Sequence, residues 1–268
     1  MRLAFLFVLF GWWAAVAPAL GDAPALGDAP APDRLPVGER GVVAEIVDGD
    51  TLILSSGTEV RLVGLQAPSL PLGRAGFKAW PLAEEAKAGL AGLTLGRVVA
   101  LHYGGRQMDR HGRALAHLVR DDGLWVQGAL LEAGHARVYS FPDNRALVPA
   151  MLMIEREARR ARRGIWAERF YAVREPDGLE RRIDTFQLVE GRVLSAAIVR
   201  GRAYLNFGVD WRTDFTASVA PRPRRVFDDE GFDLRALEGR IVRVRGWIKS
   251  FNGPMIEVTH PEQIEVFD

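Results

Sequence analysis

The sequence predicts a mainly β protein with helices (α+β) that folds as two successive units. Residues 42–69 contain three short apolar stretches separated by Gly-containing turns, a pattern typical of half-buried strands. Amphipathic helices are predicted farther along, at residues 80–93 and 145–163. A second series of apolar stretches begins at residue 188, after a charged and irregular segment. With 268 residues the chain is long enough for two small domains.

Polar side chains emerge from the first strands at Asp50, Arg61 and Gln66. A carboxylate and a guanidinium on adjacent strands suit a site that binds a metal ion and a phosphate together. The alternative is an ordinary hairpin whose Asp satisfies its own turn. Glu84 and Glu85 fall in the first predicted helix, where we expect a solvated face unless either side chain leans toward this site.

The first unit should continue with strands at residues 98–103 and 114–119, a short helix at 124–134 and an extended segment at 136–139. The connection between the two strands, GGRQMDRHGR, concentrates charge within residues 104–113. Asp109 can pair with Arg113 and hold its guanidinium in one direction, as a clamp on a transition-state phosphate requires. A charged loop that is only solvated is the alternative.

The second unit is predicted to have five strands with a short helix before the fourth, which fits a small Greek-key barrel of the OB type. The strands are expected at residues 188–199, 203–207, 215–219, 240–248 and 255–259, and the helix at 233–237. Arg243 and Arg245 alternate with Trp247 on one face of the fourth strand. Such a face can stack bases and neutralise phosphates, or it can be an ordinary solvent face.

The N-terminal segment indicates export. Residues 1–21 combine a positive start, an apolar stretch and small residues, which predicts a signal peptide. An uncleaved membrane anchor is the alternative, because the apolar stretch reaches the length of a short span. Residues 22–39 are rich in Ala, Pro and Gly and predict a flexible linker. We therefore expect an exported protein, periplasmic or secreted, without a permanent membrane span.

Charge and cysteine content narrow the functional classes. The formal net charge is +1, so no overall basicity indicates a nucleic-acid-binding protein. In residues 40–182, Lys and Arg outnumber Asp and Glu by 21 to 17, whereas in residues 183–268 the counts are 12 and 13. Any electrostatic attraction to phosphate is therefore expected in the first unit. The absence of cysteine excludes disulfides, thiolate zinc sites and cysteine nucleophiles.

Residues 42–166 resemble the staphylococcal nuclease (thermonuclease) family. Three motifs occur in the family's order: VDGDTL at 47–52, VRLVGLQAP at 60–68 and DRHGR at 109–113, followed by the last helix and GIW at 164–166. For the first unit the resemblance implies an OB-fold-type five-stranded barrel with helices, followed here by a second, smaller OB-like β-barrel. The resulting organisation is a signal peptide (1–21), a linker (22–39), a nuclease-like domain (40–167), a hinge (168–184) and an OB-like domain (185–268).

The resemblance implies Ca²⁺-dependent cleavage of DNA and RNA. It places Arg61 and Arg113 on the two arginines that grip the scissile phosphate, with Asp109 in support of Arg113. Asp50 falls on a calcium ligand and Ala67 on a ligand that acts through its backbone carbonyl. The substrate contacts implied by the resemblance are Arg110, His111 and Tyr139.

Two positions depart from the family pattern. Gln66 replaces a second calcium carboxylate, which should weaken Ca²⁺ binding and leaves Mg²⁺ or Mn²⁺ as alternatives. Ser69 replaces the glutamate credited with activating the attacking water, and a serine cannot act as a general base near neutral pH without a base of its own. A substitute base would have to be Glu84, Glu85 or bulk hydroxide.

Three functions are therefore compared. The first is an exported metal-dependent nuclease that hydrolyses phosphodiester bonds in DNA or RNA with arginine clamping of the phosphate. The second is a catalytically impaired nuclease-fold protein that binds nucleic acid or a protein partner. The third is a structural envelope protein. The joint presence of Asp50, Arg61, Asp109 and Arg113 favours the first, since a structural barrel has no need of two inward arginines.

Overall fold

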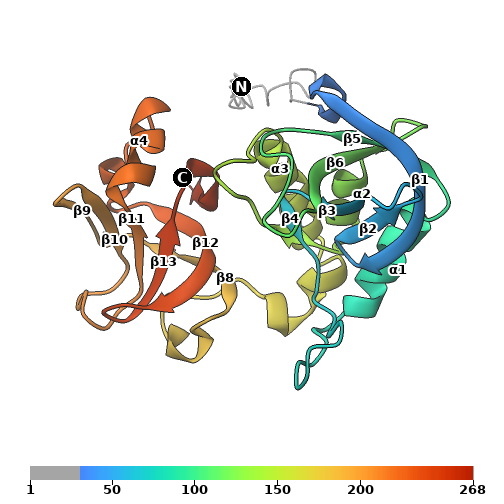
Figure 1. Cartoon of the computed structure of the whole chain (residues 1–268). Helices are drawn as coiled ribbons and strands as arrows, with labels where there is room; N and C mark the ends of the chain where they lie inside the picture. Colours follow the sequence, from blue (N-terminus) through green and yellow to red (C-terminus); the bar gives the residue numbers. More distant parts are fainter. Residues whose placement is uncertain (1–30, 268) are drawn as a thin grey trace, which may run out of the picture.

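The computed structural model describes residues 31–267 and confirms the α+β fold class, with two units side by side (Figure 1). The predicted signal peptide and most of the predicted linker lie outside the described residues. Where the linker is described, the first long strand already begins at Val37. Within residues 31–267, none of the helices has the length and apolar character needed to cross a bilayer.

The first unit is built on a closed five-stranded barrel in the order β1-β2-β3-β6-β5, which confirms the expected architecture. β3 and β6 run parallel, and the other neighbours are antiparallel. A separate pair of two-residue strands, β4 and β7, lies beside the barrel. The bounds of these strands are β1 (Val37–Asp48), β2 (Thr51–Leu54), β3 (Glu59–Leu62), β4 (Leu65–Gln66), β5 (Val98–His102), β6 (Ala114–Arg120) and β7 (Arg137–Val138).

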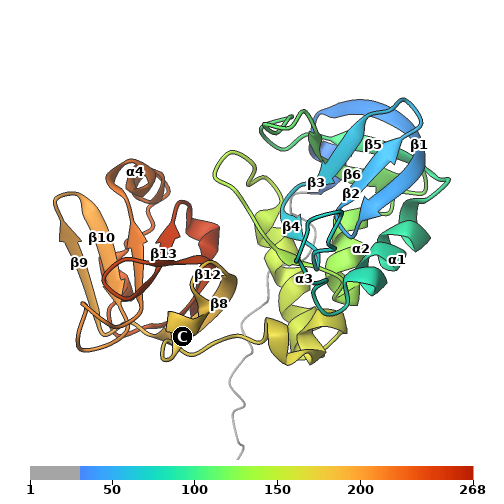
Figure 2. The same ribbon diagram turned by 60° about the horizontal axis from the view of Figure 1, so that its bottom comes forward.

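Three helices complete the core of the first unit: α1 (Ala83–Thr94), α2 (Val126–Ala133) and α3 (Val148–Arg160). Their apolar residues bury against inward-facing residues of the strands, because side chains alternate between the two faces of a strand. In β3 the alternation leaves Val60 and Leu62 fully buried and turns Arg61 away from the barrel core. α3 lies on the side that faces the second unit (Figures 1 and 2).

The second unit is a seven-stranded sheet in the order β14-β12-β13-β11-β10-β9, with β8 paired to β12. If β8 and β9 are treated as two halves of one bent strand, the pairing is that of an OB-type unit, including the parallel pair of β11 and β13. The strand bounds are β8 (Phe186–Arg192), β9 (Ser195–Val199), β10 (Arg202–Asn206), β11 (Thr216–Val219), β12 (Ile241–Ser250), β13 (Pro254–Val258) and β14 (Ile264–Phe267).

The segment before β12 differs from the expectation. It contains an α-helix, α4 (Pro221–Asp229), and only a short 3-10 turn at Arg235–Leu237 where the helix was expected. α4 has few apolar residues, of which Phe227 is buried, and two prolines near its start. Proline is tolerated in the first turn because the backbone N–H groups there have no helical partner.

The expected hinge, residues 168–184, contains 3-10 turns that contact both units. The Tyr171 hydroxyl donates a hydrogen bond of 2.7 Å to the carbonyl of Pro81 in the first unit. The Arg174 backbone N–H donates to the carbonyl of Leu188 in the second unit at 2.8 Å. The segment is therefore anchored at both ends.

A buried ionic network joins the two units. Arg245 of β12 is only 1% exposed, so the solvent-face and base-stacking interpretations of this residue are both wrong. Its guanidinium donates to both carboxylate oxygens of Glu155 in α3 at 3.0 Å and to Glu265 in β14 at 2.7 Å. Burial disfavours the charge, but Glu155 and Glu265 hold the pKa of Arg245 above its ordinary value.

Candidate phosphate-binding site

A pocket of about 480 Å³ opens on the first unit between β3, the connection 104–113 and the segment that follows β7. Six of the residues singled out in the sequence line it together: Arg61, Asp109, Arg110, His111, Arg113 and Tyr139. They come from three separate stretches of the chain. Asp50, Gln66, Ala67 and Ser69 are not among its lining residues, and neither are Glu84 and Glu85, which are exposed in the first turn of α1.

Arg61 reaches the pocket from β3. Its side chain is 21% exposed and forms an ion pair with Asp50, whose side chain is 4% exposed. Burial lowers the pKa of Arg61 from its ordinary value, the charge of Asp48 opposes this shift, and the like charge of Arg113 adds to it. Arg61 and Arg113 line the same pocket from separate segments of the chain.

Arg113 is held by Asp109 within a tight turn. One Asp109 carboxylate oxygen accepts hydrogen bonds from the Arg113 Nε at 2.8 Å and Nη2 at 2.7 Å. The other accepts from the backbone N–H groups of Arg113 at 3.0 Å and His111 at 2.8 Å. Gly112 occupies the turn with φ of +82°, a left-handed conformation that favours glycine.

These contacts fix the charge state of Asp109 and the direction of Arg113. Burial alone would raise the pKa of Asp109, but the hydrogen bonds from Arg113 and His111 hold it below its ordinary value. Asp109 therefore stays ionised and orients the Arg113 guanidinium, as the spacing predicted. The pairing uses two of the guanidinium nitrogens and leaves Nη1 available to a ligand.

Three further residues shape the rim. The Arg110 Nε donates to the His111 Nε2 at 3.1 Å, and both side chains are exposed. The Tyr139 ring packs edge-on against Phe141 at 4.9 Å and Phe186 at 5.0 Å between ring centroids. Both Tyr139 and Phe141 line the pocket, which adds aromatic surface to a lining that also holds the arginines.

The residues around Asp50 do not fit a divalent cation. Ca²⁺ takes six to eight oxygen ligands, several of them carboxylate. One Asp50 oxygen is shared by Arg61 and the Thr51 hydroxyl, and the other accepts the Ala67 backbone N–H at 2.8 Å. Across residues 31–267, no three His, Cys, Asp or Glu side chains gather in a way that could hold a metal ion.

Gln66 has a different partner from the one its motif suggests. Its side-chain carbonyl accepts two hydrogen bonds from Arg137 in β7, at 3.0 and 2.7 Å. Arg137 is 4% exposed and stacks on Phe186 at 4.5 Å, and burial lowers its pKa to about 10. The sequence reasoning did not single out Arg137, although a lone Arg inside an otherwise apolar segment was a usable signal. Gln66 is thus engaged in holding a buried cation.

Comparison with known proteins identifies the family of the first unit. A family model described as "Staphylococcal nuclease homologue" matches residues 59–168, a span that begins after Asp50 and ends before the second unit. "Protein ParB" of Escherichia coli is 34% identical over 140 residues, which cover 48% of this chain and 73% of that protein. An "Uncharacterized endonuclease" of Escherichia coli O157:H7 is 29% identical over 131 residues, covering 48% and 77%. "Probable staphylococcal-like nuclease CAN2" of Oryza sativa subsp. japonica is 30% identical over 118 residues, covering 44% and 28%.

Proposed function

The chain belongs to the staphylococcal nuclease family, and from that premise we propose that it hydrolyses phosphodiester bonds of DNA or RNA at the Arg61–Arg113 pocket. Family membership supports a nuclease-type function, and the assignment of individual residues is our own. The observation that carries it is the convergence of two guanidinium groups from separate segments on one pocket. We propose Arg110, His111 and Tyr139 as the residues that contact the nucleotides beside the scissile phosphate.

The two arginines would act mainly on the transition state. When water attacks phosphorus, the pentacoordinate phosphate gains negative charge, and fixed cationic donors stabilise it more than the ground state. Asp109 fixes Arg113 in advance, so little orientation is lost at the moment of reaction. Arg61 is neutralised by Asp50 in the resting protein and would turn part of its guanidinium toward the phosphate.

Activation of the water needs a proton acceptor, and we propose His111 for this role. The pocket-lining carboxylates are already paired, Asp109 with Arg113 and Asp143 with Arg106 at 3.8 Å. In the resting protein the His111 Nε2 lone pair accepts a hydrogen bond from the Arg110 Nε at 3.1 Å, so the exposed Arg110 side chain would have to turn away before Nε2 takes a proton from water. Oxygen of water would bond to phosphorus as the ester P–O bond breaks, with the water proton passing to Nε2 and solvent protonating the leaving oxygen.

Calcium dependence is part of the family resemblance but enters no step of this proposal. As folded, Asp50 and the Ala67 carbonyl offer too few free oxygen ligands for a hard cation. The cleavage assay below therefore compares Ca²⁺, Mg²⁺, Mn²⁺ and EDTA without assigning a metal ion to Asp50. We also propose export, on the basis of the signal-like residues 1–21, which fractionation of cells producing the full chain would test.

A catalytically impaired, nucleic-acid-binding protein is the second candidate. The observation in its favour is that Gln66, at the position of a family carboxylate, is committed to Arg137. Such a protein would keep the arginine pocket and bind nucleic acid without cutting it. Its affinity would fall steeply with salt, because phosphate contacts release counterions.

Cleavage of single-stranded and duplex DNA and of RNA separates the two candidates. The protein is assayed with Ca²⁺, Mg²⁺, Mn²⁺ or EDTA, beside Arg113→Ala and the matched control Arg160→Ala. Arg160 is 78% exposed on α3 and pairs with the neighbouring Glu157. Loss of a clamp donor costs about 10²–10³ in rate, so we expect cutting by the wild type and the control but not by Arg113→Ala. Equal rates in all three proteins would contradict the assignment.

A further inference from the structure

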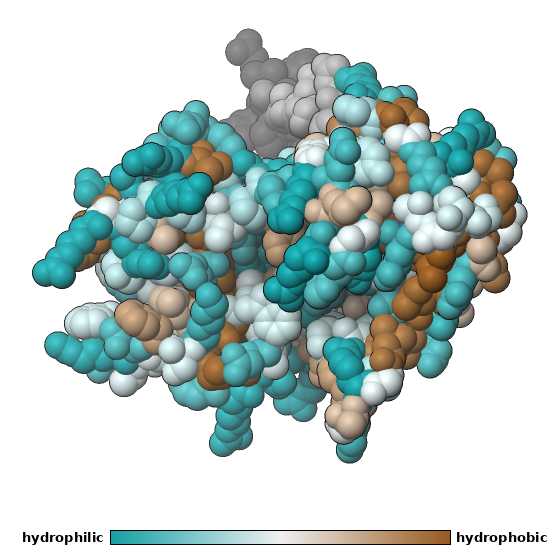
Figure 3. Space-filling view, in the orientation of Figure 1, coloured by the Kyte–Doolittle hydropathy of each residue, from teal (hydrophilic) through white to brown (hydrophobic). Residues whose placement is uncertain are grey.

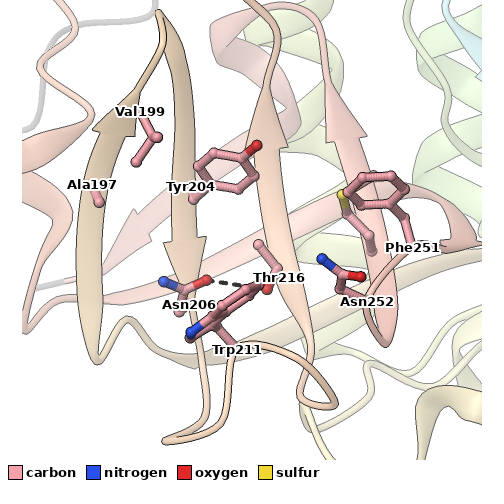
Figure 4. A pocket seen from close by; sticks show the side chains of 9 residues that line it. Ala197, Val199, Tyr204, Asn206, Trp211, Thr216, Phe251 and Asn252 are labelled. Atoms are coloured by element: carbon pink, nitrogen blue, oxygen red, sulfur yellow. Dashed lines mark hydrogen bonds between the residues drawn. The ribbon is translucent and has the colours of Figure 1, made fainter.

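The second unit carries a pocket of about 450 Å³ on the outward face of β10, β11 and β13, outside the residues that the family model matches. Tyr204 and Asn206 of β10 line it, because the alternation that buries Ala203 and Leu205 turns these side chains outward. Trp211 comes from the loop after β10 (Figure 4). Phe251 and Asn252 come from the connection between β12 and β13, and Thr216 from β11.

The large rings in this pocket are exposed. Trp211 is 52% and Phe251 59% exposed, while Phe207 and Phe215 of the same unit are buried in its core. Figure 3 shows a surface that is mostly hydrophilic, with hydrophobic residues in separate groups. Exposed aromatic residues gathered around a hollow are a feature of binding sites and are not required by the fold.

Aromatic faces and amide groups occur side by side. Figure 4 shows Tyr204, Asn206 and Trp211 on the same side of the sheet, and the Asn206 carbonyl accepts the Thr216 hydroxyl at 3.2 Å. The Asn206 amide nitrogen donates to the Ser195 hydroxyl at 3.0 Å, which fixes the amide. A nucleobase matches this lining, because it is a flat ring with hydrogen-bonding groups along its edges. Every base can stack on an aromatic side chain, whatever the nucleic-acid sequence.

Charged residues of both signs lie beside the pocket without lining it. Arg202 and Lys249 both pair with one carboxylate, Glu257, at 3.5 and 2.9 Å. The Arg212 guanidinium is 4.6 Å from the Trp211 ring centroid and 70% exposed, and its nearest Asp210 oxygen is 4.0 Å away, beyond hydrogen-bond distance. A phosphate next to a base stacked on Trp211 could therefore pair with Arg212.

A third pocket lies at the boundary between the two units. It is lined by Tyr139 and Phe141 of the first unit and by Trp247, Lys249 and Glu257 of the second. Lys249 and Glu257 lie two residues from Phe251 and Met255, which line the aromatic pocket. Tyr139 and Phe141 also line the Arg61–Arg113 pocket. Trp247 is 40% exposed, and its Nε1 donates to the Tyr139 hydroxyl at 3.0 Å. Exposed rings thus lead from the phosphate site across the boundary between the units.

We propose that the pocket formed by Tyr204, Trp211 and Phe251 binds an unpaired base of the single strand whose backbone occupies the Arg61–Arg113 pocket. The choice of this occupant rests on the proposed function. Bases of a duplex are stacked inside the helix and cannot insert between side chains, so the second unit selects single-stranded nucleic acid. The second unit would thereby contact additional nucleotides of the bound nucleic acid and take no part in bond cleavage.

Binding is measured with the full chain in EDTA, by fluorescence anisotropy of a labelled oligothymidylate of about 16 nucleotides, the upper site size of one OB-type barrel. Trp211→Ala is compared with Val209→Ala, because Val209 lies in the same loop, is 95% exposed and does not line the pocket. Loss of one stacked base weakens affinity on the order of 10-fold. We expect this loss in Trp211→Ala and Phe251→Ala, wild-type affinity in Val209→Ala, and no effect of any variant on duplex DNA.

Equal affinity of the wild type and Trp211→Ala, or no binding of the oligothymidylate at all, would overturn the inference and indicate another ligand, such as a peptide. Cleavage is measured separately. If the wild type does not cut but Trp211→Ala still weakens binding, the proposed hydrolysis fails and the base pocket stands. If the wild type cuts in an Arg113-dependent manner and Trp211→Ala binds normally, the base pocket alone fails.

Discussion

Replacement of Arg245 by methionine tests the way in which the two units are joined. Arg245 is 1% exposed and donates to Glu155 across the boundary and to Glu265 within its own unit. Methionine keeps a long apolar side chain but removes the charge. Glu155, with 0% exposure, and Glu265, with 6%, would then be buried without their principal cation.

Removal of one partner of a buried ion pair costs about 3–5 kcal/mol of unfolding free energy. Arg159 lowers this cost, since it also reaches Glu155 at 2.7 Å and Glu265 at 3.6 Å. We therefore expect a loss near the lower limit, about 3 kcal/mol, at pH 7. In urea unfolding this corresponds to a shift of the midpoint by about 1 M or more, because the denaturant slope of a domain is about 1–3 kcal/mol per M.

The matched control is Arg202→Met, which removes a 31% exposed arginine whose carboxylate partner Glu257 is also partly exposed. Exposed pairs contribute about 0–1 kcal/mol, so this variant should unfold almost as the wild type does. A loss below about 1 kcal/mol in Arg245→Met would refute the buried network. The pH adds a second check. Burial alone would raise the pKa of Glu265, but Arg245 holds this pKa below its ordinary value. The stability that ionised Glu265 contributes to the wild type is therefore lost as the pH falls through the lowered pKa. The difference in unfolding free energy between the wild type and Arg245→Met should narrow over the same pH range.

Three further predictions concern other parts of the molecule. Burial lowers the pKa of His260 from 6.5 to about 4, so between these pH values the unfolded chain binds a proton that the folded chain does not. The unfolding free energy should therefore fall by about 1.4 kcal/mol per pH unit as the pH is lowered through this range. His260→Gln should remove this dependence, as measured by urea unfolding at several pH values. Gln66→Leu removes the acceptor of two Arg137 hydrogen bonds and should cost about 1–3 kcal/mol in the same assay, with a smaller loss for Gln66→Glu. His111→Gln should lower the cleavage rate of bound DNA by about 10²-fold; an unchanged rate at saturating DNA would exclude His111 as the base.

The pocket could be predicted in large part because its residues lie in short local motifs. Asp109 and Arg113 are four residues apart in a turn with a required glycine, so their pairing depends on local backbone geometry alone. Arg61 sits between two buried apolar residues of a strand, and the alternation of side chains predicts its direction. The roles of these residues in catalysis stay predictions until the variants are assayed.

The contacts that depend on distant segments could not be predicted in this way. Arg245 alternates with Trp247 like a solvent-face residue, but α3, 90 positions earlier, covers it with Glu155. Gln66 reads as a weakened metal ligand until Arg137, 71 positions later, is placed against it. Alternation along a strand predicts two faces but not what covers each face. α4 was not predicted for a local reason, since its nine residues are mostly charged or proline and Val226 and Phe227 alone are too few apolar residues to reveal a helical period.

The most direct test of the central claim asks whether Arg61 and Arg113 act on one phosphate. The affinity for single-stranded DNA is measured for the wild type, Arg61→Ala, Arg113→Ala and the double variant, at one fixed salt concentration. Groups that share a partner are not additive, with coupling energies of about 0.5–3 kcal/mol. We predict that the double variant loses clearly less binding free energy than the sum of the two single losses. Strict additivity would place the arginines on separate parts of the ligand and contradict the account.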